Sequence, residues 1–346
     1  MRALILAGGK GTRLRPLTVY TPKPIVPVAN RPFLTYQLES LTKAGITDVT
    51  LSLSYQPDKI EDVLGDGSDY GVDLRFVTEP TALGTAGAVG FAIESLKEPV
   101  IVLNGDILTT LDLSKMLEFH ASRKDSITVA LARVKDPSNY GLVTLDDDLA
   151  VQSFVEKPAN GDLAGSNGNM INAGIYILEP DALKLIPKGT ASSFEYDVFP
   201  KALESDLSFS GYVLETDYWQ DIGTPASYLA ANVAVLSGTA GFDPVESSND
   251  LETSPTAFID SSSVLGEGCV VKPNAKITNS VLGPGVHVEE KAVIENSVIW
   301  AHTRISTFAK VRDSVVGKGC HIGKDVELRT GSVLGDKAMI PDYSVV

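Results

Sequence analysis

A repeat of 17 residues near the end of the chain constrains its fold more than any other feature. Ser-Val-Leu-Gly at 263–266 recurs at 280–283, as Ser-Val-Ile-Trp at 297–300 and Ser-Val-Val-Gly at 314–317, and at 332–335 after 18 residues. Within each period aliphatic residues lie six positions apart, as in Leu265, Val271 and Ile277. Three hexapeptides per turn predict a left-handed parallel β-helix, a triangular solenoid whose inward aliphatic side chains stack in columns.

The two cysteines test this register. Cys269 and Cys320 are 51 residues apart, or three periods, so the repeat puts them in one column three coils apart. At about 4.8 Å per coil they would be roughly 14 Å apart, which exceeds the ~7 Å Cα limit for a disulfide. We expect two free thiols that fill the core.

The chain before the repeat alternates strand-like and helix-like segments, which predicts a mostly parallel, mixed α/β sheet covered by helices. A sheet of this kind binds ligands at the carboxyl ends of its strands. The expected strands are 3–6, 49–53, 74–77, 100–103, 127–131, 142–145, 151–155 and 172–178, and the expected helices are 32–44, 57–64 and 84–96.

The composition shifts to Gly, Ser, Thr, Pro, Asp and Glu between the two regions. We interpret that stretch as a linker, although an ordered surface loop is the alternative. The predicted organisation is a catalytic domain at 1–236, a linker at 237–256 and the solenoid at 257–346.

The charge balance excludes some functions. The 29 Lys and Arg against 44 Asp and Glu give a net charge of −15, which argues against a nucleic-acid binder, since that function needs a basic surface. No apolar run approaches the ~18 residues that span a bilayer, so we expect no membrane partner. The short run Leu4–Ala7 does not fit a signal-peptide core, and we expect a cytoplasmic protein.

The strongest chemical signal is a glycine-rich loop that follows the first predicted strand. Glycines there let the backbone approach a nucleotide and offer N–H groups to phosphate, but the spacing fits neither a Walker A loop nor a dinucleotide fingerprint. Arg13 can grip phosphate oxygens with its planar fork, and Lys23 is a point charge between two prolines. The first 38 residues hold six basic residues and no acid, as a phosphate site requires. The predicted nucleotide-binding residues of this loop are Leu6, Ala7, Gly8, Gly9, Gly11, Thr12, Arg13 and Lys23.

Two aspartates are candidate metal ligands. Asn104-Gly105-Asp106 closes a predicted strand, which puts a carboxylate at the binding edge, and Asp221 lies in Trp219-Gln220-Asp221-Ile222-Gly223. Two carboxylates that meet at a triphosphate would hold Mg²⁺, which completes its shell with phosphate and water. Taken alone, either aspartate could instead be a turn former or a helix cap.

A second polar group lies farther along the chain. Lys157 could meet a second anionic substrate, and Glu156 and Asn172 could hydrogen-bond sugar hydroxyls, although a surface hairpin is the default interpretation of their spacing. Gly84-Thr85 begins a segment of small residues that suits a helix start packed close to a ligand or a sheet.

These motifs, in this order, resemble the sugar-phosphate nucleotidylyltransferases, and the resemblance covers essentially the whole chain. It implies a Rossmann-like nucleotidyltransferase domain followed by the β-helix. It also implies a transfer of a nucleoside monophosphate from a nucleoside triphosphate to a sugar 1-phosphate, with release of pyrophosphate. Within the family the chain is most similar to the branch that uses GTP and mannose 1-phosphate, on residues 79–87, 140–143 and 193–200.

The resemblance also assigns roles to residues. Arg13 and Lys23 would bind the triphosphate, Asp106 and Asp221 would coordinate Mg²⁺, and Lys157 would bind the sugar phosphate. The sugar would be held by Gly141, Glu156 and Asn172, while Glu79, Gly84, Thr85 and Asn104 complete the predicted nucleotide site.

The base and the sugar stay open at this point. Guanine presents two adjacent donors that a carboxylate such as Glu79 could read, but relatives that use UTP or dTTP can carry Glu-Pro here too. The alternatives are dTTP or UTP with glucose 1-phosphate, GTP with a heptose 1-phosphate, and a regulatory subunit without turnover. An acyltransferase is disfavoured because the unbroken repeat leaves no room for an excursion loop. We expect a homo-oligomer assembled through the solenoid.

Overall fold

The computed structural model describes residues 1–93, 97–157, 169–238, 241–243 and 245–346. The chain divides into two compact units. The sheet unit comprises Met1–Gly9 and Leu34–Trp219, and the solenoid unit comprises Lys10–Phe33 and Gln220–Val346. The segment Lys10–Phe33, which carries Arg13 and Lys23, thus belongs to the same compact unit as the C-terminal repeat.

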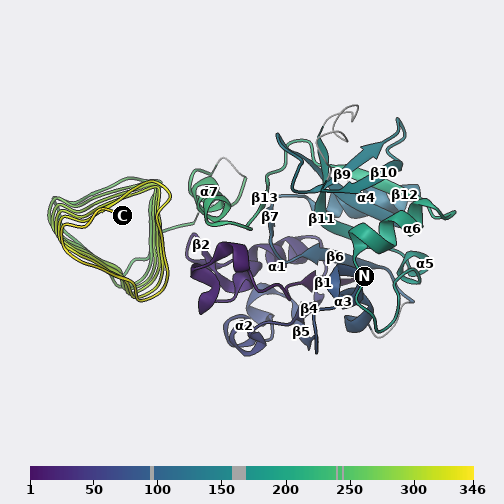
Figure 1. The fold of residues 1–346 in the computed structure, drawn as a ribbon, viewed down its shortest axis with the longest axis horizontal. Coiled ribbons are helices and arrows are strands. Elements are labelled where there is room, and N and C mark those ends of the chain that lie inside the picture. Colours follow the sequence, from purple (N-terminus) through teal and green to yellow (C-terminus); the bar gives the residue numbers. More distant parts are fainter. Residues whose placement is uncertain (94–96, 158–168, 239–240, 244) are drawn as a thin grey trace. The chain divides into compact units, whose positions relative to one another are not determined.

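The sheet unit is built on a nine-stranded mixed sheet (Figure 1). Strands β6, β1, β4 and β5 are mutually parallel, and β11 runs antiparallel to β6. The sheet order is β10-β9-β11-β6-β1-β4-β5, and β8 pairs with both β11 and β12. The bounds are β1 Arg2–Leu6, β4 Asp48–Leu53, β5 Asp73–Thr78, β6 Val100–Asn104, β8 Ile127–Arg133, β9 Gly141–Leu145, β10 Val151–Glu156, β11 Met170–Leu178 and β12 Phe209–Val213.

The remaining elements of this unit are mostly helices. A short strand, β7 (Ile107–Thr109), follows β6, and β13 (Trp219–Asp221) ends across the boundary between the two units. The helices are α1 Leu34–Lys43, α2 Pro57–Leu64, α3 Gly84–Ala92, α4 Leu113–Arg123, α5 Pro180–Leu183 and α6 Phe199–Leu203, with a 3₁₀ turn η4 at Ser68–Tyr70 and a π-helix η5 at Phe194–Val198.

The predicted strands and the two helices at 32–44 and 57–64 are confirmed within one or two residues at each end. The third predicted helix, 84–96, ends at Ala92, and positions 94–96 of that prediction lie outside the described residues. Burial explains the agreement, because the central strands are apolar on both faces, as a sheet covered by helices requires.

One hydrophobic core in the sheet unit contains an aromatic cluster. Phe199 lies 5.2–5.5 Å, ring centroid to centroid, from Phe154, Tyr176, Phe194 and Phe209. These rings join β10, β11, η5, α6 and β12, so η5 is anchored by apolar contacts to the strands that carry Glu156 and Asn172.

The C-terminal repeat forms three parallel sheets whose coils trace a triangle in Figure 1. The first sheet comprises β14 Leu251–Thr253, β17 Cys269–Val271, β20 His287–Val288, β23 Arg304–Ile305, β26 His321–Ile322 and β29 Met339–Ile340. The second comprises β15 Phe258–Ile259, β18 Lys276–Thr278, β21 Val293–Glu295, β24 Lys310–Arg312 and β27 Glu327–Leu328. The third, named here the β16–β28 face, comprises β16 Val264–Leu265, β19 Val281–Leu282, β22 Val298–Ile299, β25 Val315–Val316 and β28 Val333–Leu334.

The predicted register of the solenoid is confirmed. The strand pairs place Val270, His287, Arg304 and His321 in one column, so the neighbouring Cys269 and Cys320 are three coils apart. Both cysteines are free and buried, and burial raises the pKa of each thiol. They fill the core as inert apolar groups.

Two features of the structure lie across the predicted domain boundaries. Strand β14 (Leu251–Thr253) pairs with β17, so the first coil begins inside the predicted linker 237–256. The compact units also cut across the predicted catalytic domain, because Lys10–Phe33 and helix α7 (Pro225–Leu236) cluster with the repeat. Residues 239–240 and 244 of the predicted linker lie outside the described residues.

The segment Lys10–Phe33 contains three 3₁₀ turns and a short antiparallel pair of strands. The elements are η1 Thr12–Leu14, η2 Leu17–Val19, η3 Lys23–Ile25, β2 Pro27–Val28 and β3 Arg31–Pro32. Across the described part of the chain, the helices are too short or too polar for one to cross a membrane.

Candidate active site

The loop after β1 begins in close contact with the strands beside it. The Ser54 hydroxyl donates a hydrogen bond to the Gly8 carbonyl. A Cβ at Gly8 would lie 3.1 Å from Ser54 Oγ and 3.2 Å from Glu79 Oε1, whereas a Cβ at Gly9 would meet no described atom within 4 Å. The backbone therefore faces open space at Gly9, as a loop that approaches a ligand needs.

Strand β6 ends beside β1. Leu6 pairs with Asn104, and the Gly105 amide donates to the Leu6 carbonyl at 2.9 Å, so Asp106 leaves the sheet at this edge. The Asn104 Oδ1 atom is buried and has no hydrogen-bond partner among the described residues. An unpaired buried acceptor costs about 1–3 kcal/mol, and a donor from a bound ligand or water would relieve that cost.

Glu79 is buried, with 8% of its surface exposed, and braces the turn before α3. Its Oε1 accepts a hydrogen bond from the Ser52 hydroxyl and its Oε2 accepts one from the Leu83 amide, both at 2.9 Å. Each oxygen keeps one lone pair, because an ionised carboxylate offers about four acceptor positions. Glu79 is therefore fixed in orientation and can still accept from a base.

The start of α3 is bound to η5 rather than open. Gly84 has a φ of +73°, and a Cβ there would lie 2.5 Å from the Ser192 carbonyl oxygen. That carbonyl accepts from the Ala86 and Gly87 amides at 3.0 Å. The Thr85 hydroxyl donates to Glu195 Oε2 and accepts from the Phe194 amide, each at 2.9 Å.

Thr85 is a predicted nucleotide-binding residue, and its hydroxyl makes both of these hydrogen bonds inside the protein. Its hydroxyl proton is already donated inside the protein, so a nucleotide contact of Gly84 or Thr85 is left to the backbone. The side chain of Thr85 instead holds Glu195 in place.

The predicted sugar-binding residues gather at the β9–β10 hairpin. Glu156 pairs with Gly141, and a Cβ at Gly141 would lie 2.9 Å from Glu156 Oε2. The Lys157 ammonium lies 3.7 Å from Glu156 Oε1, and its side chain is 63% exposed. Burial, and then the nearby Glu195 carboxylate, raise the pKa of Glu156, while Lys157 opposes that shift. Pro158, the last residue of the motif, lies outside the described residues.

A network of hydrogen bonds connects Asn172 with Tyr176 and Glu195. The Asn172 side chain donates to the Tyr176 hydroxyl at 2.8 Å and accepts from the Gly174 amide at 2.9 Å. The Tyr176 hydroxyl donates to Glu195 Oε1 at 3.5 Å. Burial raises the pKa of Tyr176 far above its ordinary value, so this hydroxyl keeps its proton and stays a donor.

Glu195 and Tyr176 are the site residues that the sequence analysis missed. Glu195 is the centre of the network, since it contacts Thr85 and Tyr176 and influences Glu156 electrostatically. The only sequence signal was its place in the segment 193–200, which was noted for its resemblance and given no role.

Aromatic groups border the same region of the sheet unit. The Trp219 indole N–H donates to the Ala173 carbonyl at 2.9 Å, and its ring meets Tyr140 edge to face with centroids 5.5 Å apart. The Tyr140 carbonyl in turn accepts from the Lys157 amide at 3.1 Å. Trp219 thereby connects the strand of Asn172 to the residue that precedes Gly141.

The remaining candidates lie in the solenoid unit. Gly11 has a φ of +60°, and a Cβ there would lie 3.1 Å from the Lys23 Cβ, so the loop folds back onto the start of η3. Arg13 lies exposed on η1, and Lys23 is mostly buried. Thr12 is the first residue of η1 and precedes Arg13.

Arg13 and Asp221 approach the same point. A Cβ at Gly223 would lie 2.6 Å from Asp221 Oδ2 and 3.0 Å from Arg13 Nη2. Glycine at 223 therefore leaves room for a guanidinium and a carboxylate side by side at the start of α7. That helix is capped next to this point by a reciprocal Thr224–Ser227 capping box.

The aspartates fit a metal that takes most of its ligands from substrate. No group of three or more His, Cys, Asp or Glu side chains forms a metal cluster within the described ranges. Mg²⁺ is commonly bound by one or two carboxylates together with phosphates and waters. The predicted ligands Asp106 and Asp221 both carry hard oxygen donors of that kind.

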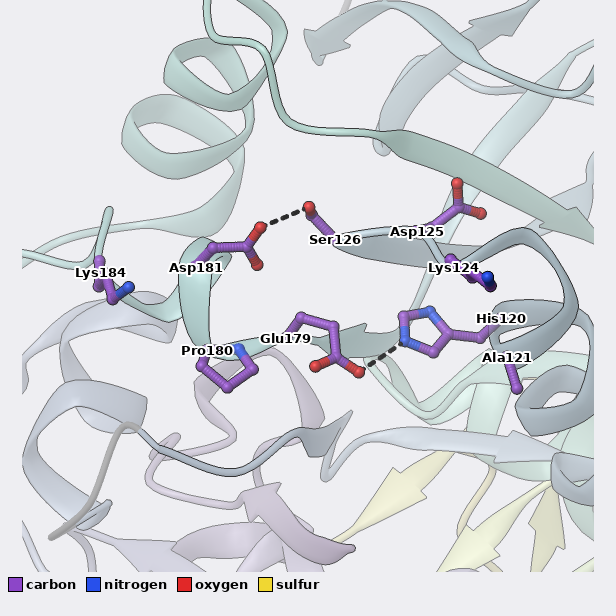
Figure 2. Close-up of a pocket in the computed structure, with 9 residues that line it drawn as sticks. All are labelled: His120, Ala121, Lys124, Asp125, Ser126, Glu179, Pro180, Asp181 and Lys184. Carbon is purple, nitrogen blue, oxygen red and sulfur yellow. Dashed lines mark hydrogen bonds and ion pairs between the residues drawn. The ribbon is translucent and has the colours of Figure 1, made fainter.

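A separate cavity of about 550 Å³ lies where β8 starts and β11 ends, beside the start of β6 and not its carboxyl end. Figure 2 shows the side chains that line it. Its polar side chains mainly bond one another. His120 contacts Thr128 Oγ1 at 2.8 Å and Glu179 Oε1 at 3.3 Å, and the Ser126 hydroxyl donates to Asp181 Oδ2 at 2.7 Å. His120 is thus held inside the fold, away from the strand ends that carry the candidate site.

Comparison with known proteins gives the chain its family. Residues 2–238 match the family described as nucleotidyl transferase, and residues 245–346 match the left-handed β-helix domain described for the EIF2B epsilon subunit. A mannose-1-phosphate guanylyltransferase of Mycobacterium tuberculosis is 37% identical over 80% of this chain and 77% of its own length. A mannose-1-phosphate guanyltransferase of Pichia angusta is 36% identical over 78% and 74%. A mannose-1-phosphate guanylyltransferase catalytic subunit beta of Drosophila pseudoobscura pseudoobscura is 38% identical over 78% and 71%.

The two matched ranges agree with the two kinds of structure along the chain. The nucleotidyl transferase match contains the mixed sheet, the glycine-rich loop and both aspartates, and the second match contains the triangular solenoid. The chain therefore belongs to the nucleotidyl transferase family, with a left-handed β-helix as its C-terminal domain.

Proposed function

We propose that this protein transfers GMP from GTP to mannose 1-phosphate and so forms GDP-mannose and pyrophosphate. The observation that carries the proposal is the similarity to relatives named for this activity over more than three quarters of the chain. The polar network around Glu156, Asn172 and Glu195 supports it, because it offers fixed hydrogen-bond partners for a sugar beside the Lys157 ammonium.

The reaction needs no protein base. The sugar phosphate is already an anion at neutral pH, and its oxygen attacks the α-phosphorus of GTP. The bond from that phosphorus to the β-phosphate oxygen breaks, and pyrophosphate leaves. Such a reaction is accelerated by positioning the two anions in line and compensating their charge. The position of His120, with both ring nitrogens bonded inside the fold, is consistent with this chemistry.

The triphosphate is assigned to the segment Lys10–Phe33. Arg13 offers a planar fork for phosphate oxygens and stabilises the charge that develops as pyrophosphate leaves. Lys23 adds a point charge from the start of η3. The open backbone at Gly9 supports a role in binding phosphate, and Leu6, Ala7, Gly8, Gly11 and Thr12 complete the proposed loop site.

The metal is assigned to Asp106 and Asp221, and we propose Mg²⁺. The bound ion would neutralise negative charge on the triphosphate. The two carboxylates are hard oxygen donors of the kind that Mg²⁺ prefers. A Cβ at Gly223 would lie close to both Asp221 and Arg13, so the proposed metal ligand has a cation in its neighbourhood.

The sugar 1-phosphate is assigned to the hairpin and to β11. Lys157 binds the phosphate with its exposed ammonium. Glu156 accepts hydrogen bonds from sugar hydroxyls, and Asn172 can accept or donate one. Gly141 lets the Glu156 carboxylate lie against the backbone. Asn104, whose buried Oδ1 has no described partner, accepts a donor from a bound substrate.

Base choice is assigned to Glu79. Guanine presents N1–H and N2–H donors together, and each Glu79 oxygen keeps a lone pair after bonding Ser52 and Leu83. The fixed carboxylate therefore favours guanine over uracil or thymine, and the names of the relatives favour GTP over dTTP and UTP.

The test is pyrophosphate release with Mg²⁺ across GTP, UTP, dTTP, ATP and CTP against mannose, glucose and heptose 1-phosphates. Preference for GTP with mannose 1-phosphate is the expected result. A peak at dTTP or UTP with glucose 1-phosphate would overturn the base assignment but keep the mechanism. No turnover in any combination, with nucleotide still bound, would favour a regulatory subunit.

The Asp106→Ala variant tests the metal assignment within the same assay. We expect turnover to be lost while the unfolding temperature stays within about 1–2 °C of the unmodified protein, because a change of a few tenths of a kcal/mol moves it by no more. Full activity in this variant would remove Asp106 from the metal site.

Assembly and location are further proposals from the sequence. A homo-oligomer through the solenoid is tested by light scattering on the purified protein, and a cytoplasmic location by fractionation of cells.

A further inference from the structure

Trp300 departs from the repeat of the solenoid. The tetrads at 263–266, 280–283, 314–317 and 332–335 all end in glycine, and only 297–300 ends in tryptophan. At Gly283 and Gly317 a Cβ would lie 2.5 Å and 2.7 Å from a backbone nitrogen of the next coil. The stacking of the coils therefore does not explain a large side chain at this position.

The Trp300 side chain is buried against helix α7 of the same unit. Only 3% of Trp300 is exposed and Tyr228 is fully buried. The indole N–H donates to the Tyr228 hydroxyl at 2.9 Å, and the two rings meet edge to face with centroids 6.4 Å apart. The Tyr228 hydroxyl in turn donates to the Pro27 carbonyl of β2. Two buried hydrogen bonds thus connect the solenoid to the segment that carries Arg13 and Lys23.

Other contacts bind the same segment at both sides of Lys23. The Ala29 amide donates to Asn232 Oδ1 on α7, and the Asn30 side chain donates to the Leu282 carbonyl, each at 2.8 Å. A Cβ at Gly335 would lie only 3.0 Å from the Pro16 Cβ, so the chain just after Arg13 also packs on the solenoid.

These three solenoid contacts share one face. Leu282 belongs to β19, Trp300 follows β22, and Gly335 follows β28, all in the β16–β28 face. A face of stacked parallel coils is rigid, whereas Lys10–Phe33 has little regular structure of its own. Arg13 and Lys23 lie on short 3₁₀ turns of this segment, and they need such a support if they are to be in place before the charge develops.

We propose that Trp300 and Tyr228 are positioning residues for nucleotidyl transfer, through which the solenoid fixes the backbone of Lys10–Phe33 and with it Arg13 and Lys23. The inference rests on the proposed function. It gives the solenoid a part in the reaction besides assembly, because the residues involved touch no substrate and act only through the backbone that they hold.

The test compares Trp300→Phe, Tyr228→Phe and the double variant with Val311→Ala. The first two remove a buried hydrogen bond and keep an aromatic ring, while Val311→Ala opens the solenoid core at β24, outside the β16–β28 face. We expect kcat/KM for GTP to fall about tenfold in each aromatic variant, the loss typical of one buried hydrogen bond, with KM for mannose 1-phosphate unchanged. In the double variant, kcat/KM for GTP should fall by less than the product of the two single fold-changes, because both substitutions break the same chain of hydrogen bonds.

A purely structural role gives a different result. Val311→Ala should lower the unfolding temperature and leave both KM values unchanged. If Trp300→Phe behaves in the same way, with KM and kcat for GTP unchanged per folded molecule, the inference is overturned.

A second measurement keeps this outcome separate from a failure of the proposed function. Hydrogen exchange of the amides in Lys10–Phe33 should be about tenfold faster in Trp300→Phe, as expected for one lost hydrogen bond, and unchanged in Val311→Ala. This readout needs no substrate, so it supports or overturns the coupling even if the substrates are not GTP and mannose 1-phosphate. Unchanged exchange in both aromatic variants would overturn it.

Discussion

At the scale of single residues, some candidate site side chains lie where their charged form costs free energy of folding. Glu156 is the clearest case, because burial and the neighbouring Glu195 raise its pKa although Lys157 lies 3.7 Å away. A raised pKa means that the folded protein disfavours the ionised form. Ionised Glu156 therefore costs stability at pH values above that pKa, and the cost is relieved as the pH falls through it.

The Glu156→Gln variant should separate stability from binding. At neutral pH we expect an unfolding temperature equal to or above that of the unmodified protein, because a buried charge is removed. The KM for mannose 1-phosphate should rise about tenfold or more, as for a lost hydrogen bond to a charged group. In the unmodified protein this KM should rise as the pH falls through the raised pKa of Glu156, and in the variant it should not. A clear loss of stability at neutral pH would contradict the argument.

Gly223 is a second residue whose role is set by its neighbours. Its missing side chain leaves space for Asp221 Oδ2 and Arg13 Nη2, which a Cβ would approach to 2.6 and 3.0 Å. The ends of flexible side chains can move aside cheaply, so the fold tolerates an alanine better than the chemistry does.

Gly223→Ala should therefore lower kcat by about a hundredfold, the loss typical of a misplaced catalytic group, with little change in stability. Thr224→Ala is the matched control, since it removes the capping box of α7 and should cost about 1 kcal/mol of stability with kcat retained. Equal kcat in Gly223→Ala and the unmodified protein would show that the Arg13–Asp221 arrangement is dispensable.

At the scale of elements, the serine of each solenoid tetrad has a specific task. The Ser280 hydroxyl accepts from the Ser297 amide at 3.1 Å, and Ser297 does the same for Ser314 at 3.2 Å. These serines are buried and lie 17 residues apart. The repeated serine therefore satisfies an amide at the corner that the sheet ladders do not reach.

Ser280→Ala should leave the Ser297 amide without its side-chain acceptor and destabilise the solenoid by about 1–3 kcal/mol. Thermal unfolding monitored by tryptophan fluorescence would measure this change. Ser261→Ala, at an exposed position two residues before the first tetrad, should have little effect. Equal stability of both variants would contradict this role of the Ser280 hydroxyl.

The contact between α3 and η5 is one that local sequence patterns could not predict. The start Gly84-Thr85 suggests a helix that binds a ligand, but its first amides and its hydroxyl form hydrogen bonds with Ser192, Phe194 and Glu195. These partners lie more than 100 residues away in the sequence. No local signal announces such a pairing.

At the scale of the whole molecule, the proposed chemistry is divided between two compact units. The sugar-binding candidates, Glu79 and Asp106 lie in the sheet unit, and Arg13, Lys23 and Asp221 lie in the solenoid unit. The sheet unit contains one proposed metal ligand, Asp106, and the solenoid unit contains the other, Asp221, together with Arg13 and Lys23.

Metal removal tests this arrangement. With excess EDTA we expect turnover to stop and the unfolding temperature to change by less than about 1 °C, because a metal that does not help the free protein to fold adds nothing to its stability. Added Mg²⁺ should restore turnover, and it should raise the unfolding temperature only when GTP is present. A large fall in unfolding temperature on chelation alone would indicate a structural metal instead.

The sequence by itself determined the solenoid, the order of strands and helices, and most candidate site residues. These features depend on local spacing: six-residue columns fix the coils, and apolar runs followed by polar residues fix the strand ends. The tertiary structure alone decided which distant groups meet. It placed Glu195 beside Thr85 and Tyr176 and Gly223 close to Arg13 and Asp221, and it bound Lys10–Phe33 to the solenoid through Tyr228 and Trp300. Such pairings bring together residues far apart along the chain, and their free energy arises from burial and hydrogen bonds that exist only once the chain has folded.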